Sequence, residues 1–455
     1  MIRSPLSRVL LLACSTTAAA PALADPVELL VHNGYVMTMD PERGDLPAAD
    51  VLIRDGRIVA VGRNLQAPAA QRIDARGGIV LPGFVDTHSH LYTTTMRGQF
   101  RNADGRFFPV SSKLAAAMSA DDTRVAMQLG AMQLLEGGIT TTGDFFDNIQ
   151  SPAHAEAGWA GLQASGIGGV MYYGGPDRST RHAIDLSHLE TMVARIPAGS
   201  PLQIGLAWRL PRERADAGNW KLRDDEMAMA RTLRIPAQVH VSGEPGPMFD
   251  ALIERGYLQP GLTVVHATDA TPAQLAALER AGASISLTPL SEHRVGYGIT
   301  RVDHYRSASR LGLGIDGNPL AGTADMYATL RHAALTLSAG RRDEAAADPR
   351  ALLILATRGG AAVLGLDDEV GSLTPGRRGD LQIIDTGALN LVGAADTDPA
   401  ALLVYDVRPD NVDTVVVGGR LLKHGGKLVA PGQEALIAEA SASARALRKR
   451  AAAQE

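Results

Sequence analysis

The sequence predicts an α/β protein: a (β/α)8 TIM barrel with a small β-sandwich domain that is assembled from both chain ends. Two observations carry this prediction. Between residues 80 and 369, eight short apolar segments alternate with Ala-rich helical segments, which is typical of a barrel of parallel strands. Residues 25–79 and 370–430 instead contain β-rich runs separated by tight turns, so both flanks are expected to form one small domain.

Dipeptides that favour tight turns mark the expected strands of the two flanks. Asn33-Gly34 and Asp55-Gly56 lie between β-rich runs near the N-terminus, and Gly418-Gly419 lies between two such runs near the C-terminus. Pairs of this kind adopt the positive φ angles that two-residue hairpins require. We therefore expect a turn at each of the three pairs.

Residues 1–24 predict a secretory signal peptide. Arg3 and Arg8 are followed by an apolar stretch, and an Ala-Leu-Ala triplet fits cleavage after Ala24. The apolar stretch is too short to span a membrane, which argues against stable membrane insertion. The alternative to a signal peptide is a frayed, Ala-rich N-terminal helix. We therefore expect a periplasmic or secreted protein, whose mature form has lost the only cysteine, Cys14.

The composition narrows the classes of partner. The 455 residues include 44 Lys and Arg against 49 Asp and Glu, which gives a net charge of −5, and no basic run stands out. Nucleic acid is therefore excluded as an expected partner, and a small-molecule substrate is favoured. Residues 431–455 predict an Ala-rich helical tail, which either packs on a neighbour, as in a homo-oligomer, or lies in solvent.

Four of the eight apolar segments end in side chains that can bind a metal ion. His88 and His90 end the first segment, His240 the fifth, His266 the sixth and Asp316 the eighth. The C-terminal ends of barrel strands meet at one rim, and two residues one apart in a strand point to the same face. Each residue alone would be read as a core histidine or a turn residue, but the joint pattern predicts a site for one divalent ion. Zn²⁺ suits these donors best, and Fe²⁺ and Mn²⁺ also tolerate them.

Several motifs, in this order, resemble the amidohydrolase superfamily. They are "GGIVLPGFVDTHSHLYTTTMRG", "GITTTGDF", "VHVSG", "VVHATD" and "LGLGIDGNP". More narrowly, they resemble its metal-dependent aminohydrolase branch, which contains chlorotriazine hydrolases and deaminases of cytosine, guanine and adenosine-type compounds. Matched position by position, the resemblance implies metal binding by His88, His90, His240 and Asp316, with His266 beside the water on the metal.

The sequence departs from this branch at two positions. The branch commonly has a glutamate three residues after the fifth-strand histidine, where this chain has Gly243, followed by Glu244. It also has an asparagine after the seventh strand, where this chain has Glu292. Either a local bulge lets Glu244 substitute for the missing glutamate, or the usual chemistry on cyclic amidines is absent.

The residues suggest a division of catalytic roles. Asp316 is expected to bind the ion and to accept a proton from water, and His266 to stabilise the nucleophile or the developing oxyanion. Glu244 is the nearest unassigned carboxylate that could protonate a leaving amine. The fourth apolar segment, "LQIGLAWRL", contains no lysine to bridge two metals, so we expect a mononuclear site.

Candidate substrate contacts follow from position in the predicted barrel. Tyr173, Trp208 and Arg209 end the third and fourth segments and would face the pocket, although both aromatic residues are equally compatible with packing at the rim. Arg97 follows the first strand and would line the entrance.

Three functions remain open on the sequence alone. The first is a metal-dependent hydrolase that removes an amino group from a ring, and the second is an amide or carbamate hydrolase; both cleave a C–N bond of a small molecule. The third, from a different class, is a non-catalytic metal-containing binding protein. The intact ligand set together with His266 favours an enzyme.

Overall fold

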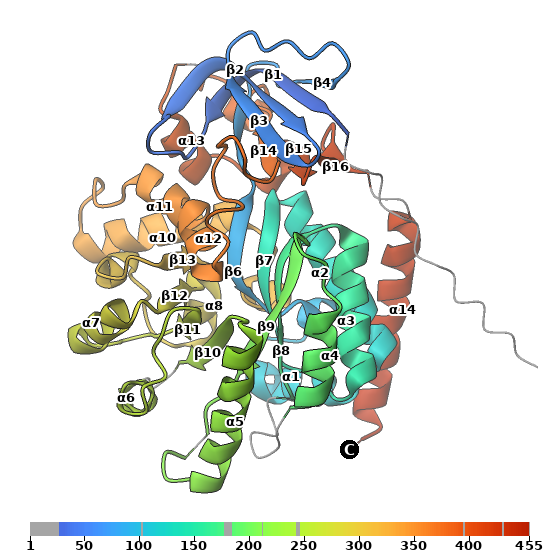
Figure 1. The fold of residues 1–455 in the computed structure, drawn as a ribbon, viewed down its shortest axis with the longest axis vertical. Helices are drawn as coiled ribbons and strands as arrows, with labels where there is room; N and C mark the ends of the chain where they lie inside the picture. Colours follow the sequence, from blue (N-terminus) through green and yellow to red (C-terminus); the bar gives the residue numbers. More distant parts are fainter. Residues whose placement is uncertain are drawn as a thin grey trace, which may run out of the picture.

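The computed structural model contains a barrel and, at one end of it, a separate β-sheet (Figure 1). It describes residues 27–101, 103–176, 184–211, 213–242, 246–394, 396–429 and 432–454. The predicted signal peptide, residues 1–24, and Cys14 lie outside the described residues. Within the described part of the chain, none of the helices has the length and apolar content that crossing a membrane requires.

The barrel is built from eight neighbouring parallel strands, which confirms the predicted fold class. A parallel bridge between Ser89 and Asp316 joins the first strand to the residues just after the last one. The strands are β6 (Phe84–Ser89), β7 (Ile139–Phe146), β8 (Gly168–Tyr173), β9 (Leu202–Trp208), β10 (Ala237–Val241), β11 (Leu262–His266), β12 (Ser284–Leu287) and β13 (Leu311–Leu313).

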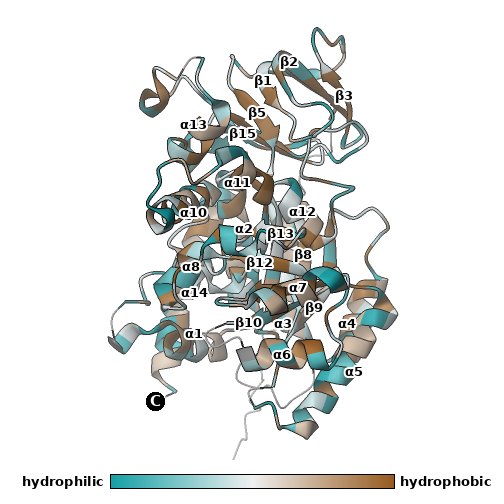
Figure 2. Ribbon diagram, turned by 90° about the vertical axis from the view of Figure 1, so that its left-hand side faces the viewer, coloured by the Kyte–Doolittle hydropathy of each residue, from teal (hydrophilic) through white to brown (hydrophobic). Residues whose placement is uncertain are grey.

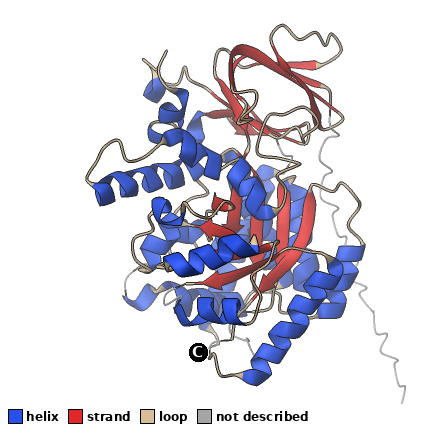
Figure 3. Ribbon diagram, turned by 60° about the vertical axis from the view of Figure 1, so that its left-hand side comes forward, coloured by secondary structure: helices blue, strands red, loops and turns tan. Residues whose placement is uncertain are grey.

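Helices surround the barrel strands (Figure 3). Local sequence explains where several of them begin: Ser119 and Thr271 form capping boxes at two N-termini, and Pro occupies the first turn of others. Between and after the strands lie α2 (Ala120–Glu136), α3 (Pro152–Ser165), α4 (Leu186–Ala194), α5 (Ala217–Leu233), α6 (Gly246–Glu254), α7 (Pro272–Ala281), α8 (Pro289–Val295), α9 (Asn318–Ala321), α10 (Met326–Arg341), α11 (Pro349–Leu355) and α12 (Arg358–Leu364).

The second sheet is mixed and contains strands from both chain ends, as predicted. It is joined across the ends by the antiparallel pairing of β5 with β14 and encloses an apolar core of its own. Figure 2 shows hydrophobic residues along strands such as β5. Its strands are β1 (Leu29–Met37), β2 (Asp45–Arg54), β3 (Arg57–Gly62), β4 (Gln71–Asp74), β5 (Ile79–Pro82), β14 (Leu381–Ile384), β15 (Val412–Val417), β16 (Arg420–His424) and β17 (Lys427–Leu428).

Two of the three expected turns are present. Asp55-Gly56 connects β2 to β3, Gly418-Gly419 connects β15 to β16, and all four residues have positive φ. Asn33-Gly34 instead lies inside β1, so the hairpin predicted there is wrong. The register against β2 shifts at this point, and β1 pairs with β4 before the shift and with β5 after it. The Asn-Gly pair therefore forms a bulge within a continuous strand.

The remaining helical segments follow the first barrel strand, lie beside the small sheet or pack on α2. A one-turn segment, η1 (Leu91–Met96), and α1 (Phe107–Ala116) follow β6, and α13 (Pro399–Tyr405) lies beside the small sheet. The tail forms α14 (Gln433–Ala452) and packs along α2 of the same chain. Ser443 donates a hydrogen bond of 2.6 Å to Asp122, and Arg450 forms an ion pair with the same carboxylate.

Candidate active site

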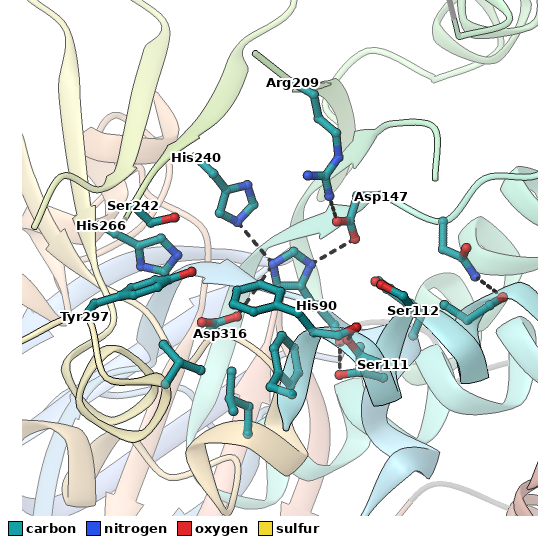
Figure 4. A pocket seen from close by; sticks show the side chains of 18 residues that line it. His90, Ser111, Ser112, Asp147, Arg209, His240, Ser242, His266, Tyr297 and Asp316 are labelled. Carbon is teal, nitrogen blue, oxygen red and sulfur yellow. Dashed lines mark hydrogen bonds and ion pairs between the residues drawn. The ribbon is translucent and has the colours of Figure 1, made fainter. Parts of the chain in front are cut away.

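Three imidazoles converge at the C-terminal ends of the barrel strands. The Nε2 atoms of His88 and His90 are 3.1 Å apart, those of His90 and His240 3.3 Å, and those of His240 and His88 3.1 Å. Ligand nitrogens that share one tetrahedral ion at about 2.0–2.1 Å lie roughly 3.3 Å from one another. The spacing of the three nitrogens therefore fits a single divalent ion. Figure 4 shows His90 and His240 pointing toward the same space.

The outer nitrogens of two of these rings are held by side chains from other parts of the barrel, β10 and the end of β7. His88 Nδ1 donates to Gln238 Oε1 at 2.9 Å, and His90 Nδ1 donates to Asp147 Oδ1 at 3.1 Å. Because an amide or carboxylate oxygen only accepts, the hydrogen lies on Nδ1 and the lone pair on Nε2 faces the cluster. Burial lowers the pKa of His88 and of His240 well below its ordinary value, and also lowers that of His90. Neutral rings are the form that binds metal.

Asp316 supplies an oxygen to the same cluster. Its Oδ1 lies 3.6 Å from His90 Nε2. Burial alone would raise the pKa of Asp316, but the neighbouring His90, His266 and His88 outweigh it and the net shift is downward. The carboxylate is therefore ionised at neutral pH. Three nitrogens and one carboxylate oxygen form a donor set that suits a divalent ion such as zinc.

His266 lies beside this cluster at the end of β11. One of its ring nitrogens is within 4.8 Å of ligand atoms of His88 and His240, whereas its Nδ1 is 3.0 Å from Glu292 Oε1. His266 and Asp316 both adopt positive φ, 70° and 63°, which is uncommon for residues other than glycine. Strained backbone of this kind concentrates at functional sites. In this protein the positive φ angles turn the chain at His266, which ends β11, and at Asp316, which follows β13.

The predicted substrate contacts divide into one that lines the cavity and three that do not. Arg209 lines it and forms an ion pair with Asp147, the residue that holds His90. Of the two alternatives for Trp208, the structure shows packing: the side chain is fully buried, with its indole N–H donating to Arg223 O at 3.1 Å. Successive strand residues point to opposite sides, so if Arg209 faces the cavity, Trp208 faces the helices.

Tyr173 and Arg97 also lie away from the cavity. The Tyr173 hydroxyl is 3.2 Å from His188 Nδ1, between the barrel and α4. Arg97 is exposed and donates to Gln133 on α2, because the chain leaves the rim as the turn η1 instead of continuing over the mouth. Glu244 and Gly243 lie outside the described residues; Ser242, the residue before them, lines the cavity.

Several residues of the cavity were not anticipated. Asp147 follows β7 and could have been found by the strand-end argument that identified the histidines. The aromatic side chains could not, because they lie on connecting segments. Phe107 and Phe108 begin α1, and Tyr297 follows α8. The cavity has a volume of about 230 Å³, and its other lining residues include Tyr92, Thr93, Ser111, Ser112, Asn148, Val295 and Leu320.

Comparison with known proteins agrees with this geometry. Residues 79–422 match the model of the amidohydrolase family, so the chain belongs to this family. A 5'-deoxyadenosine deaminase from Methanosarcina barkeri is 27% identical over 92% of this chain and 98% of its own length. A 5-methylthioadenosine/S-adenosylhomocysteine deaminase from Desulforudis audaxviator is also 27% identical, over 92% and 99%.

Two solved structures share the fold. A zinc-bound adenosine deaminase from Xanthomonas campestris superposes with a TM-score of 0.80 at 22% identity, covering 93% of this chain and 99% of that one. A variant of atrazine chlorohydrolase from Arthrobacter aurescens, in complex with zinc and atraton, gives 0.80 at 24%, covering 91% and 100%. The predicted aminohydrolase branch is confirmed: this chain is a metal-dependent hydrolase of C–N bonds, and the non-catalytic alternative is set aside.

Proposed function

We propose that the protein is a zinc-dependent deaminase that replaces the amino group of a small planar ring compound by oxygen and releases ammonia. One observation carries the proposal: three imidazole nitrogens, the Asp316 carboxylate and His266 form one cluster at a cavity that aromatic side chains also line. Zinc is favoured over iron or manganese because the three nitrogens have the spacing of tetrahedral ligands. The relatives named as deaminases act on adenosine-type compounds, which contain such a ring.

The chain's own residues account for the proton movements. A divalent ion, when bound at this centre, supplies Lewis acidity, which lowers the pKa of water and polarises the bond under attack. His266, whose Nδ1 is engaged by Glu292, presents its other nitrogen to the attacking water as an acceptor. Asp316 is ionised and takes the proton of the water. The same proton then passes to the departing nitrogen as the C–N bond breaks, so that water and the ring amine yield ammonia and a ring hydroxyl; the hydroxyl hydrogen then moves to the adjacent ring nitrogen and leaves the ring carbonyl.

The aromatic wall supports a planar substrate. The rings of Phe108 and Tyr297 have their centroids 6.5 Å apart with an interplanar angle of 27°, and Tyr297 is edge-on to His266 at 5.7 Å. Phe108 is 49% exposed although it lines the cavity. A ring compound that entered here would cover this apolar surface, which is favourable at about 25 cal/mol per Å² buried.

A second candidate function is hydrolysis of an amide or carbamate. Gly243 replaces the glutamate that relays protons to a ring nitrogen in the aminohydrolase branch. Among the described residues that line the cavity, the carboxylates are Asp147 and Asp316. Asp147 already contacts His90 and Arg209 through its two oxygens. An amide nitrogen needs only one proton on departure, and Asp316 can return it.

The test is an assay of ammonia and amine release by the zinc-loaded protein. Its panel holds adenosine-type and other amino-substituted rings, together with simple amides and carbamates, and His266→Asn serves as the inactive reference with metal retained. Ammonia from a ring amine supports the first function. Cleavage of amides or carbamates alone supports the second. A zinc-loaded protein that cleaves no member of the panel would contradict both.

The location of the protein outside the cytoplasm is proposed from the sequence. Arg3, Arg8 and the apolar stretch before Ala24 support export to the periplasm or beyond. N-terminal sequencing of the protein from fractionated cells tests this: a mature chain that begins at Asp25 in the exported fraction is the expected result, and an intact Met1 in the cytoplasm would contradict it.

A further inference from the structure

We propose that Glu292 is a positioning residue that fixes the orientation and the tautomer of His266. The inference rests on the proposed function, in which His266 must present one ring nitrogen to water; Glu292 would hold the ring in that orientation. Glu292 lies in the first turn of α8, and its side chain is fully buried. A buried carboxylate is costly unless donors surround it, so its contacts indicate what it is for.

Every contact of the Glu292 carboxylate involves a donor held in place. Its Oε1 accepts from His266 Nδ1 at 3.0 Å, from the Thr288 backbone N–H at 2.9 Å and from the Thr288 hydroxyl at 3.3 Å. The Thr288 hydroxyl also lies 3.1 Å from His266 Nδ1. Its Oε2 accepts from the hydroxyl of Thr300. No lysine or arginine of the described chain forms an ion pair with Glu292; His266 is its basic partner.

This arrangement dictates which nitrogen of His266 carries the hydrogen. An ionised carboxylate has no hydrogen to donate, so the hydrogen must lie on Nδ1 of His266. The lone pair then lies on Nε2, which is left free to act as an acceptor in the neighbourhood of His88 and His240. An amide at position 292 carries no charge and is a weaker acceptor for Nδ1–H, and would therefore select this tautomer less strongly.

A second layer of contacts keeps the carboxylate from turning. The Thr300 backbone N–H donates to His293 Nε2 at 2.8 Å, and His293 Nδ1 lies 2.7 Å from His332 Nε2 on α10. Because His293 Nε2 accepts, its Nδ1 carries the hydrogen and donates to His332. The segment that carries Thr300 is thereby fastened to a helix of the barrel wall, and Thr300 in turn holds Glu292.

The decisive experiment compares zinc-loaded wild type with Glu292→Gln and with Glu279→Gln, a variant of an exposed carboxylate on α7 that bonds the Ser309 backbone. We expect Glu292→Gln to lower kcat by about 10- to 100-fold with KM and zinc content unchanged, as for residues that orient active-site ligands. Glu279→Gln should match the wild type. A merely structural role of Glu292 would lower thermal stability and leave kcat unchanged, and that result would overturn the proposal.

A second measurement does not depend on turnover. In ¹⁵N-histidine NMR spectra, His266 of the wild type should show the Nδ1–H tautomer, and in Glu292→Gln it should show a mixture. Observation of the Nε2–H tautomer in the wild type would overturn the inference even if the enzyme is active. If the wild type cleaves no compound of the panel but the Nδ1–H tautomer is present, the proposed function fails and the positioning role stands.

Thr300 provides a graded check on the second layer. Thr300→Val removes the hydroxyl that holds Glu292 Oε2 and should lower kcat several-fold, in the same direction as Glu292→Gln. Thr300→Ser keeps the hydroxyl and should restore most of the lost rate. Equal kcat values for Thr300→Val and the wild type would contradict the role of the second layer.

Discussion

The two sides of the cavity are built on different principles. On the ligand side, His88, His90 and His240 stand on strand ends; His88 and His90 are buried, and each of these two is fixed by a second side chain. On the aromatic side, Phe108 and Tyr297 are held by the start of a helix and by a loop. The metal-binding side chains are therefore held by the rigid barrel. The aromatic residues that would contact the substrate lie on connecting segments, which can vary without disturbing the metal-binding side chains.

The largest effect is expected from breaking the ligand side. His90→Ala removes one of three converging nitrogens and the ring N–H that Asp147 accepts, while the ion pair of Asp147 with Arg209 is retained. We expect zinc content and hydrolytic activity to fall to background, measured by elemental analysis and by ammonia release. His424→Ala, a histidine of the small sheet, is the control and should bind zinc as the wild type does. Full zinc occupancy in His90→Ala would show that the cluster is not the metal site.

A smaller effect should follow from removing a group that orients a ligand. Gln238→Ala deletes the acceptor of His88 Nδ1 but no ligand. Loss of such partners typically weakens metal binding by about 10- to 100-fold. Competition with a chelator of known zinc affinity measures this, again with His424→Ala as reference. An unchanged zinc affinity would mean that packing within the barrel is sufficient to orient the His88 ring.

The aromatic side should respond through substrate binding and not through metal. Phe108→Ala removes one of the two facing rings; a ring–ring contact is worth about 0.5–1.5 kcal/mol, which corresponds to a roughly 2- to 10-fold higher KM for ring amines. Zinc content should not change. Leu335→Ala, at another exposed apolar residue, serves as the control. A KM that rises equally for acyclic amides would contradict a contact specific to rings.

The smallest effect concerns pH. Burial lowers the pKa of His88, His90 and His240, so these rings stay neutral below the ordinary histidine value. Since protons compete with metal only for rings that take them up, zinc content after dialysis should be the same at about pH 7.5 and about pH 6. Release of zinc near pH 6 would show that the rings titrate as exposed histidines do.

The sequence predicts the residues on strand ends better than the residues on connecting segments. His88, His90, His240, His266 and Asp316 could be found because strand ends in a parallel barrel meet at one rim. For Trp208 and Tyr173 the sequence left pocket and packing open as equal alternatives, and both side chains are used in packing; apolar segments that are buried on both faces do not show which residues point inward.

Other parts of the site leave no periodic signal. Phe107, Phe108 and Tyr297 reach the cavity from segments whose path depends on tertiary packing. Glu292 was visible as a departure from the family pattern, but its contact with His266 depends on the turn between β12 and α8. Asn33-Gly34 shows the same limit in the small sheet, where pairing with three neighbours overrides a local turn preference.

The closure of the barrel gives the metal site a mechanical consequence. The last strand, β13, has only three residues, and the seam with β6 is completed by Asp316, whose N–H donates to His88 O at 2.7 Å. Donor groups of the candidate site therefore stand on both edges of this seam. An ion bound by His88, His90 and Asp316 would connect the two edges of this seam, so that metal binding and closure of the barrel become a single cooperative event.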